Sequence, residues 1–446
     1  MAKILFLLLC FVLPLTIRAQ NADERIGRFM SENRWFDLAR ELKVTPMDSV
    51  TPLLHQMAVA MTHHYFNRPD SACIVLGDLL NNNQQELGSN TLGMATLMGI
   101  NLARTEHYAE AAGLIQSLYD QLTAQNVDST QTENYRVLAQ QYKTYASYGE
   151  ICKPLHSTGE YRIPMIINNE TEQHSLNIDS RINGNETRLL FDTGAGVNII
   201  SSQQAKEYGF HLLDAGMPMM GIGMQQGRYA LCDTLRIGGM AWANVPFFVV
   251  DIQTGNTKAD SICKDIPPVI GLPIMLRMKE VQLDFANREF IIPATPTPNP
   301  LHESNLLRTD GENLRLAATD KAGNPLYFHF DTGCYYTTLL PKWYNSHKVE
   351  VENTGMPDSL RMAGVGGVSI TRSYVLPQME FCIGNGFIVL DSVNVNTGID
   401  LNTGQLKNTA YLNREEDGTI GLDLPEKFSR VIINLKDMYL EAIPYQ

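Results

Sequence analysis

Apolar side chains recur every three or four positions through the first part of the chain. They fall at Trp35, Leu38, Ala39 and Leu42, and the same spacing returns in the stretch that begins at Tyr108. This period places apolar side chains along one face of an α-helix. Residues 20–150 are therefore predicted to form a helical domain.

The pattern also suggests how these helices are arranged. The stretch YAEAAGLIQSLYDQL, which begins at Tyr108, resembles the second helix of a tetratricopeptide unit, and similar stripes begin near Trp35 and Asp70. This resemblance implies helical-hairpin repeats. A plain helical bundle remains open as an alternative.

From Tyr161 onward the hydrophobic pattern changes. Short β-branched runs such as RIPMII, TRLLF and VPFFVV are bounded by Gly, Asn and Pro, which is typical of strands and turns. A Pro-rich stretch, 294–304, predicts an extended linker between two β segments, 161–293 and 305–446. The expected fold class is multidomain, all-α followed by a double-lobed all-β region.

Composition and charge exclude several classes of protein. Hydrophobic residues make up 44% of the 446 positions and charged residues 19%, a balance typical of globular proteins. The net charge of −13 argues against a nucleic-acid partner, because such binding needs clustered Lys and Arg. No apolar run is long enough for a transmembrane segment once the N-terminal stretch described next is removed.

The N-terminal stretch has the layout of a signal peptide. Lys3 precedes an apolar core from Ile4 to Leu15, and Ala19 offers a cleavage site, so residues 1–19 are predicted to be removed on export. We expect a periplasmic or secreted protein. Six cysteines remain after Cys10 is removed, an even number that permits disulfides, with buried free thiols as the alternative.

The two β segments carry the same motifs in the same order. Phe191-Asp192-Thr193-Gly194 and Phe330-Asp331-Thr332-Gly333 lie 139 positions apart, and each follows a strand that a Gly-Asn turn precedes. An apolar pair and a glycine follow in each copy, ending at Gly271 and Gly421. The shared order indicates an internal duplication.

These motifs resemble those of retropepsin-like aspartic peptidases with two lobes in one chain, over roughly residues 160–446. The resemblance implies that Asp192 and Asp331 are catalytic carboxylates. It also implies that two threonines and four glycines support the active-site turns: Thr193, Gly194, Thr332, Gly333, Gly271 and Gly421. Substrate-binding flap hairpins would lie at Gly221-Ile222-Gly223 and Gly364-Val365-Gly366.

Paired carboxylates suit the hydrolysis of a peptide bond. Two close carboxylates share one proton, so one activates a water as a base and the other acts as an acid, with no metal or other cofactor. The expected substrate is a peptide or protein, and the helical domain is a candidate site for a protein partner. Ala195 and Cys334 follow the two turns where a hydroxyl would lower the carboxyl pKa, which predicts a working pH nearer 5–7 than 2–3.

A thiol nucleophile at Cys334 is disfavoured, because it needs a paired histidine and His329, two residues before Asp331 on the same strand, is expected to be a core or groove-lining residue. One alternative concerns the whole chain and stays open. The chain as a whole is either an exported aspartic endopeptidase or a catalytically silent protein that binds peptides or acts as a scaffold on a protease-derived fold.

Overall fold

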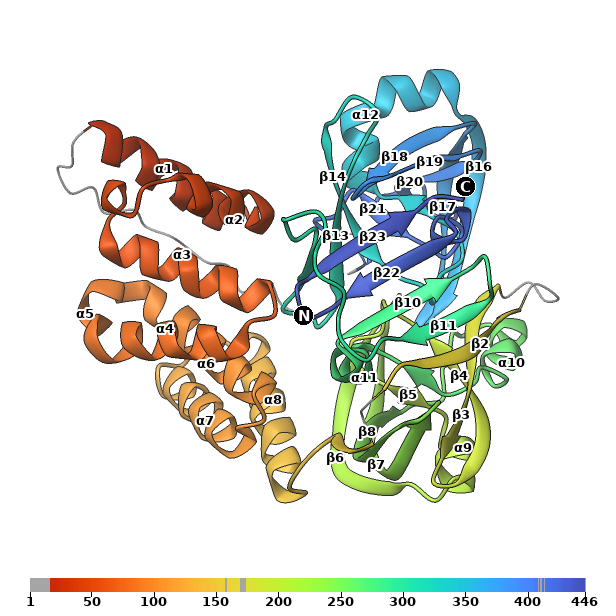
Figure 1. Cartoon of the computed structure of the whole chain (residues 1–446), viewed down its shortest axis with the longest axis horizontal. Coiled ribbons are helices and arrows are strands. Elements are labelled where there is room, and N and C mark those ends of the chain that lie inside the picture. Colours follow the sequence, from red (N-terminus) through yellow and green to blue (C-terminus); the bar gives the residue numbers. More distant parts are fainter. Residues whose placement is uncertain are drawn as a thin grey trace. The chain divides into compact units, whose positions relative to one another are not determined.

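The computed structural model describes residues 17–156, 159–168, 174–407, 409, 411–412 and 414–445. The chain divides after Glu150 into two compact units, a helical one and a β-rich one (Figure 1). The predicted order of an all-α region followed by a β-rich region with two sheets is confirmed. Most of the predicted signal peptide, 1–19, lies outside the described residues.

The helical unit consists of helices that pack against their neighbours in the sequence. The described helices are α1 Ile17–Ser31, α2 Trp35–Val44, α3 Pro52–Tyr65, α4 Pro69–Asn82, α5 Gln84–Leu87, α6 Thr91–Arg104, α7 Tyr108–Ala124 and α8 Ser129–Ser147. The apolar stripe of α7 is buried through Ala111, Ile115 and Leu118. The tetratricopeptide-like character of the unit stays a prediction. None of the described helices is both long and apolar enough to cross a membrane.

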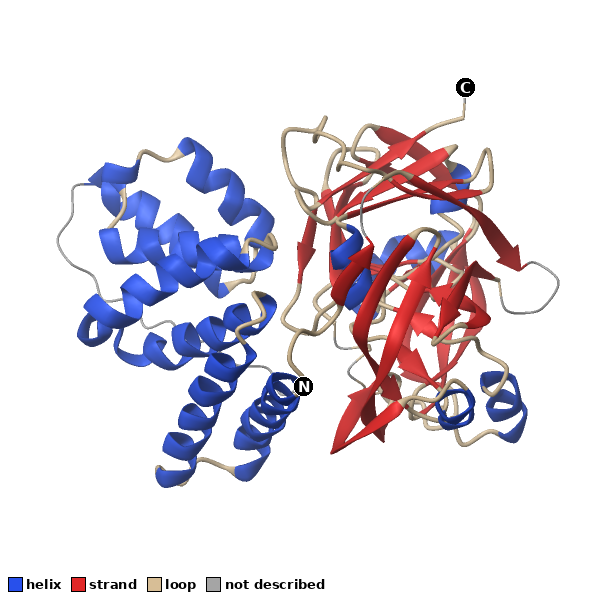
Figure 2. Cartoon of the chain, turned by 60° about the horizontal axis from the view of Figure 1, so that its bottom comes forward, coloured by secondary structure: helices blue, strands red, loops and turns tan. Residues whose placement is uncertain are grey.

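The β-rich unit consists mainly of strands, with a few short helices (Figure 2). Its first sheet joins strands from both ends of the unit. Its order is β23-β22-β10-β11-β2-β3-β4-β9-β5-β8-β7-β6, with β1 paired to β8. The strands are β1 Lys153–His156, β2 Tyr161–Asn168, β3 Ser175–Ile182, β4 Asn185–Phe191, β5 Ile199–Ile200, β6 His211–Met220, β7 Met224–Ile237, β8 Met240–Val249, β9 Val269–Ile270, β10 Glu280–Asp284, β11 Glu289–Ile292, β22 Arg430–Asn434 and β23 Tyr439–Ile443.

The second sheet has the order β16-β17-β20-β15-β21-β14-β13-β18-β19, with β12 paired to β13. Its strands are β12 Leu306–Arg308, β13 Leu314–Thr319, β14 Pro325–Phe330, β15 Thr338–Leu339, β16 Met356–Gly364, β17 Gly367–Leu376, β18 Met379–Ile383, β19 Gly386–Leu390, β20 Val393–Asp400 and β21 Gly418–Ile420.

Four helices lie within the predicted β segments. They are α9 Ser202–Glu207, α10 Thr257–Cys263, α11 Leu272–Met278 and α12 Pro341–Thr354. The longest, α12, begins with Pro341 at a position where the missing N–H costs nothing, and it buries Trp343, Tyr344 and Val351. Burial of these three side chains accounts for a helix inside a segment with a strand-like pattern.

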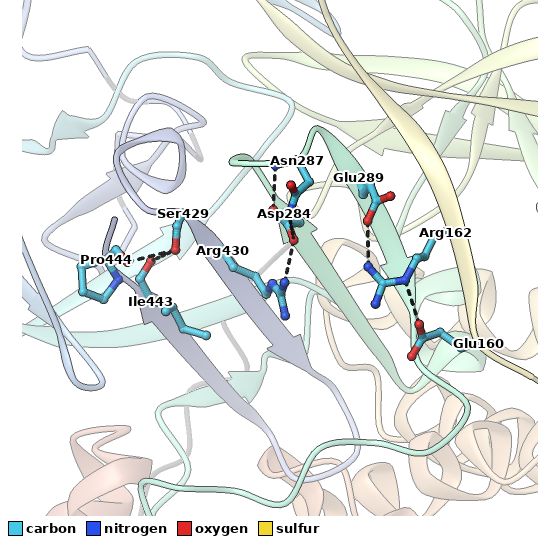
Figure 3. Close-up of polar contacts among 9 residues, drawn as sticks. All are labelled: Glu160, Arg162, Asp284, Asn287, Glu289, Ser429, Arg430, Ile443 and Pro444. Carbon is cyan, nitrogen blue, oxygen red and sulfur yellow. Dashed lines mark hydrogen bonds and ion pairs between the residues drawn. The ribbon is translucent and has the colours of Figure 1, made fainter. Parts of the chain in front are cut away.

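The last strands of the chain extend the first sheet. β22 pairs antiparallel with β10, so the C-terminal hairpin lies beside strands that end about 140 residues earlier. Figure 3 shows polar side chains that link the neighbouring strands on this sheet. Arg430 donates to Asp284 at 2.6 Å, and Arg162 donates to Glu289 at 2.8 Å.

Candidate active site

Each aspartate lies directly after a strand whose last residue is buried. Asp192 follows β4 and Asp331 follows β14, and each strand pairs in parallel with a short strand, β9 or β21. The N–H of Asp192 donates to the Ile270 carbonyl at 3.1 Å, and that of Asp331 donates to the Ile420 carbonyl at 3.0 Å. Phe191 and Phe330 are fully buried and fix the ends of β4 and β14 in the core.

The threonines bring the two turns together. The N–H of Thr193 donates to Thr332 Oγ1 at 3.1 Å, and the N–H of Thr332 donates to Thr193 Oγ1 at 3.0 Å. The Thr193 hydroxyl in turn donates to the Phe330 carbonyl, and the Thr332 hydroxyl donates to the Phe191 carbonyl. Both threonines are fully buried. Four reciprocal hydrogen bonds therefore hold the turns side by side.

The same arrangement places the two carboxyl groups against each other. Asp192 Oδ1 accepts from the Gly194 N–H at 2.8 Å, and Asp331 Oδ1 accepts from the Gly333 N–H at 3.0 Å. A Cβ on Gly194 would overlap the Asp331 carboxyl group, and one on Gly333 would overlap that of Asp192. Each carboxyl group therefore lies against the glycine of the opposite turn. Glycine is therefore required in both turns.

The two carboxyl groups titrate as a pair. Burial, and then the charge of Asp331, raises the pKa of Asp192 well above its usual value. Burial also raises the pKa of Asp331, and the positive charge of Arg414 opposes that rise. Because two close carboxylates do not both ionise readily, the pair shares one proton. The Asp331 side chain stays 24% exposed, so water reaches it.

His329 and Cys334 lie beside Asp331. His329 Nε2 is 3.7 Å from Asp331 Oδ2. Burial, with Arg414 and Arg315 nearby, lowers the pKa of His329 well below its usual value, so the ring is neutral. Burial also raises the pKa of the Cys334 thiol, whose Sγ lies 3.6 Å from the Tyr336 carbonyl oxygen. A protonated thiol disfavours the alternative of a cysteine nucleophile.

The backbone around Gly271 and Gly421 supports the turns. The Gly271 N–H donates to Asn198 Oδ1 at 3.0 Å, and the Gly421 N–H donates to Thr337 Oγ1 at 3.1 Å. Sequence reasoning missed Asn198 and Thr337, although each lies six positions after its aspartate and continuing the alignment of the two copies would have found them. Arg414 was also missed, because it lies in a loop whose path no motif predicts.

The predicted flap residues occupy hairpin turns. Gly221-Ile222-Gly223 connects β6 to β7, and Gly364-Val365-Gly366 overlaps the turn from β16 to β17. The two tips meet, since the Gly223 N–H donates to the Val365 carbonyl at 3.0 Å. A Cβ on Gly221 would lie 2.8 Å from Val365 Cβ, so the tips pack closely only with glycine.

The six described cysteines, Cys73, Cys152, Cys232, Cys263, Cys334 and Cys382, are all free thiols, so the free-thiol alternative holds for this structure. Cys334 therefore does not distort the second turn through a disulfide. In the described part of the chain, no group of three or more His, Cys, Asp or Glu side chains could hold a metal ion.

Comparisons with known proteins agree with this architecture. Residues 178–273, which include the first turn and Gly271, match the family model described as aspartyl protease. Solved structures with similar folds include the basic 7S globulin from soybean, with 12% identity, a TM-score of 0.38, and coverage of 64% of this chain and 94% of that one.

Two further solved structures match. A retropepsin-like aspartic protease from Rickettsia conorii has 19% identity and a TM-score of 0.21, and the match covers 30% of this chain and 89% of that one. Conglutin gamma, a basic 7S globulin from lupine seeds, has 13% identity and a TM-score of 0.36, with coverage of 64% and 94%. A search of curated proteins finds no match. The family match over residues 178–273, together with the duplicated turns, supports an aspartic-protease-like fold for the β-rich unit.

Proposed function

We propose that this protein is an aspartic endopeptidase that hydrolyses peptide bonds with a water activated between Asp192 and Asp331. The observation that carries the proposal is the pair of buried-turn carboxyl groups, each lying against the glycine of the opposite turn and held there by the reciprocal threonine contacts. Such a pair supplies a base and an acid at one place without a covalent intermediate.

The pair shares one proton, so one member acts as a base and the other as an acid. We assign the base to Asp331, because the positive charge of Arg414 favours its ionised form, and Asp331 removes a proton from the attacking water. Asp192 donates its proton to the carbonyl oxygen of the substrate as the tetrahedral intermediate forms. The proton that Asp331 has gained then passes to the leaving nitrogen as the C–N bond breaks. At the same time one hydroxyl of the intermediate becomes the carbonyl of the new carboxyl group and returns its proton to Asp192, so the pair again holds one proton.

The setting of the peptidase is also part of the proposal. The apolar N-terminal stretch ending at Ala19 supports export to the periplasm or the cell exterior. An extended peptide held near the β6–β7 and β16–β17 hairpins is the expected substrate, since exposed backbone groups of such strands recognise extended chains. The helical unit as a docking site for a protein partner stays a prediction.

The first test is cleavage of a mixed peptide pool by residues 20–446 between about pH 3 and pH 8, with Asp192→Asn and Asp331→Asn variants alongside. Each variant is expected to lose cleavage by about 10³-fold or more, since it removes an acid or a base of the reaction. A statine-type inhibitor is expected to block the unmodified protein.

Circular dichroism of the two variants serves as the folding control. Folded protein without cleavage at any pH would contradict the peptidase and favour the alternative, a catalytically silent protein that binds peptides. Cleavage that persists in either variant would show that the aspartate pair does not carry the reaction.

A further inference from the structure

The two active-site turns have equivalent backbones but different side chains just beyond them. The Leu272 N–H donates to the Ala195 carbonyl and the Leu422 N–H donates to the Cys334 carbonyl, each at 2.9 Å. The chain therefore follows the same path after both aspartates. At the next two positions the first copy has Gly196 and Val197, whereas the second copy has Tyr335 and Tyr336.

The first copy has no room for a side chain at the first of these positions. A Cβ on Gly196 would lie 2.9 Å from the Glu312 carbonyl oxygen and 3.1 Å from that of Gly311. These atoms belong to the turn before β13, so backbone of the second lobe closes this position. The neighbouring Val197 is half-buried.

In the second copy aromatic rings occupy the equivalent region. The Tyr335 ring stacks on His174, which directly precedes β3, with ring centres 4.2 Å apart. Tyr336 packs edge-to-face on Tyr335 at 4.9 Å and remains 60% exposed. Cys334 directly follows Gly333 of the second turn and precedes the two tyrosines. Its thiol lies 3.6 Å from the Tyr336 carbonyl oxygen.

The exposed ring of Tyr336 is suited to pack against a further flat group. Its ring is already held by a second ring, so little conformational entropy remains to be lost when a third flat group packs on it. Tyr336 lies five positions after Asp331 in the chain, so its exposed area is close in sequence to the aspartate pair. Nothing comparable exists at Gly196 and Val197.

We propose that His174, Tyr335 and Tyr336 form a one-sided specificity site that binds an aromatic side chain of an extended peptide on the second-lobe side of the aspartate pair. This inference rests on the proposed function for its substrate class, a peptide. It adds that an aromatic side chain is selected on only one side of the cleaved bond, because the first copy has Gly196 and Val197 where the second has two tyrosines.

The test measures both binding and cleavage by residues 20–446 with short extended peptides in which Phe or Ala is placed at each position in turn. Binding is followed by fluorescence anisotropy, which requires no hydrolysis. Phe is expected to be preferred over Ala about tenfold at a position on one side only. Tyr336→Ala should remove that preference, whereas Tyr336→Phe should keep it.

Val197→Ala is the matched control, since it shortens the side chain at the equivalent position of the first copy and should leave the preference intact. Because Tyr336 is largely exposed, its variants are expected to fold, and thermal melts check this. A preference that survives in Tyr336→Ala overturns the specificity site, and cleavage by the same samples would leave the peptidase standing.

The remaining outcomes separate the two proposals further. A binding preference that depends on Tyr336 in a protein that never cleaves would support the aromatic site and contradict the peptidase. An equal preference for Phe on both sides overturns the one-sided site. Absence of any peptide binding overturns both.

Discussion

At the scale of single residues, Asp192 and Asp331 share a motif but not an environment. His329 lies two residues before Asp331, and the equivalent position before Asp192 is Leu190. Arg414 approaches Asp331 from the loop between β20 and β21 and opposes the rise of its pKa. The duplicated motif supplies two similar carboxyl groups, and residues outside the motif make them different.

This difference predicts the pH dependence of cleavage. Activity needs one proton on the pair, so kcat/KM should fall at low pH as the pair gains a second proton and at high pH as it loses the only one it holds. The pKa of each carboxyl group is raised, so the acid limb should lie above the usual range of a lone aspartate. The pH profile of kcat/KM measures both limbs.

The variant Arg414→Gln tests whether the charge of Arg414 sets the pH at which kcat/KM falls on the acid side of the profile. Loss of the positive charge should raise the pKa of Asp331 and move the acid limb to higher pH by about 0.5–1 pH unit. Asp192, His329 and Cys334 also face Asp331 and are unchanged in this variant. Lys348→Gln removes a charge from the exposed face of α12 and should leave the limb in place. An unmoved limb in Arg414→Gln would contradict the assigned electrostatics.

At the scale of elements, the two glycine-rich hairpins meet at their tips. The Gly223 N–H donates to the Val365 carbonyl, and a Cβ on Gly223 would overlap the Gly366 carbonyl group. Neither tip can therefore gain a side chain without moving the other. The contact between β6–β7 and β16–β17 depends on glycine in both copies of the duplication.

Gly223→Ala is expected to separate the tips. If the hairpins hold the substrate, KM should rise by about three- to tenfold while kcat changes less, because the carboxyl groups are untouched. Gly216→Ala is the matched control in the same hairpin, since a Cβ there meets nothing closer than 3.9 Å. Equal kinetics for the two variants would argue against a role of the tip contact in substrate binding.

Elements with a regular hydrophobic period could be predicted from the sequence, whereas elements and contacts without such a period could not. The α-then-β order and runs such as RIPMII, which lies in β2, were readable because apolar periodicity and β-branched composition decide them. The helix α12 was missed because its polar composition conceals the buried Trp343 and Tyr344. The contact between the hairpin tips and the position of Arg414 depend on chain paths distant in sequence, which no local pattern encodes.

At the scale of the whole molecule, a buried carboxylate connects the linker to the shared sheet. Glu280 at the start of β10 is fully buried, and it accepts hydrogen bonds from Thr297 in the Pro-rich linker and from Asn434 at the end of β22. Gln282 donates to it as well. One side chain thus holds the junction between the first β segment and the C-terminal strands.

Glu280→Gln should destabilise the β-rich unit by about 2–4 kcal/mol, because the new NH₂ group would face donors instead of accepting from them. Glu289→Gln on the adjacent strand β11 makes the same change at an exposed pair with Arg162 (Figure 3) and should cost less than about 1 kcal/mol. Urea unfolding followed by circular dichroism and tryptophan fluorescence measures both. Similar losses in the two variants would contradict the role given to Glu280.

The pairing of β22 with β10 has a consequence for the order in which the protein is made. Asp192 and β10 leave the ribosome long before residues 430–434, which complete the sheet beside β10. Asp331 and its supporting glycine, Gly421, also arrive late. A nascent or prematurely terminated chain therefore has half of a catalytic pair and an open sheet edge. On the proposed function, proteolytic activity appears only when synthesis is nearly finished, and translation itself limits damage to the cell that makes the enzyme.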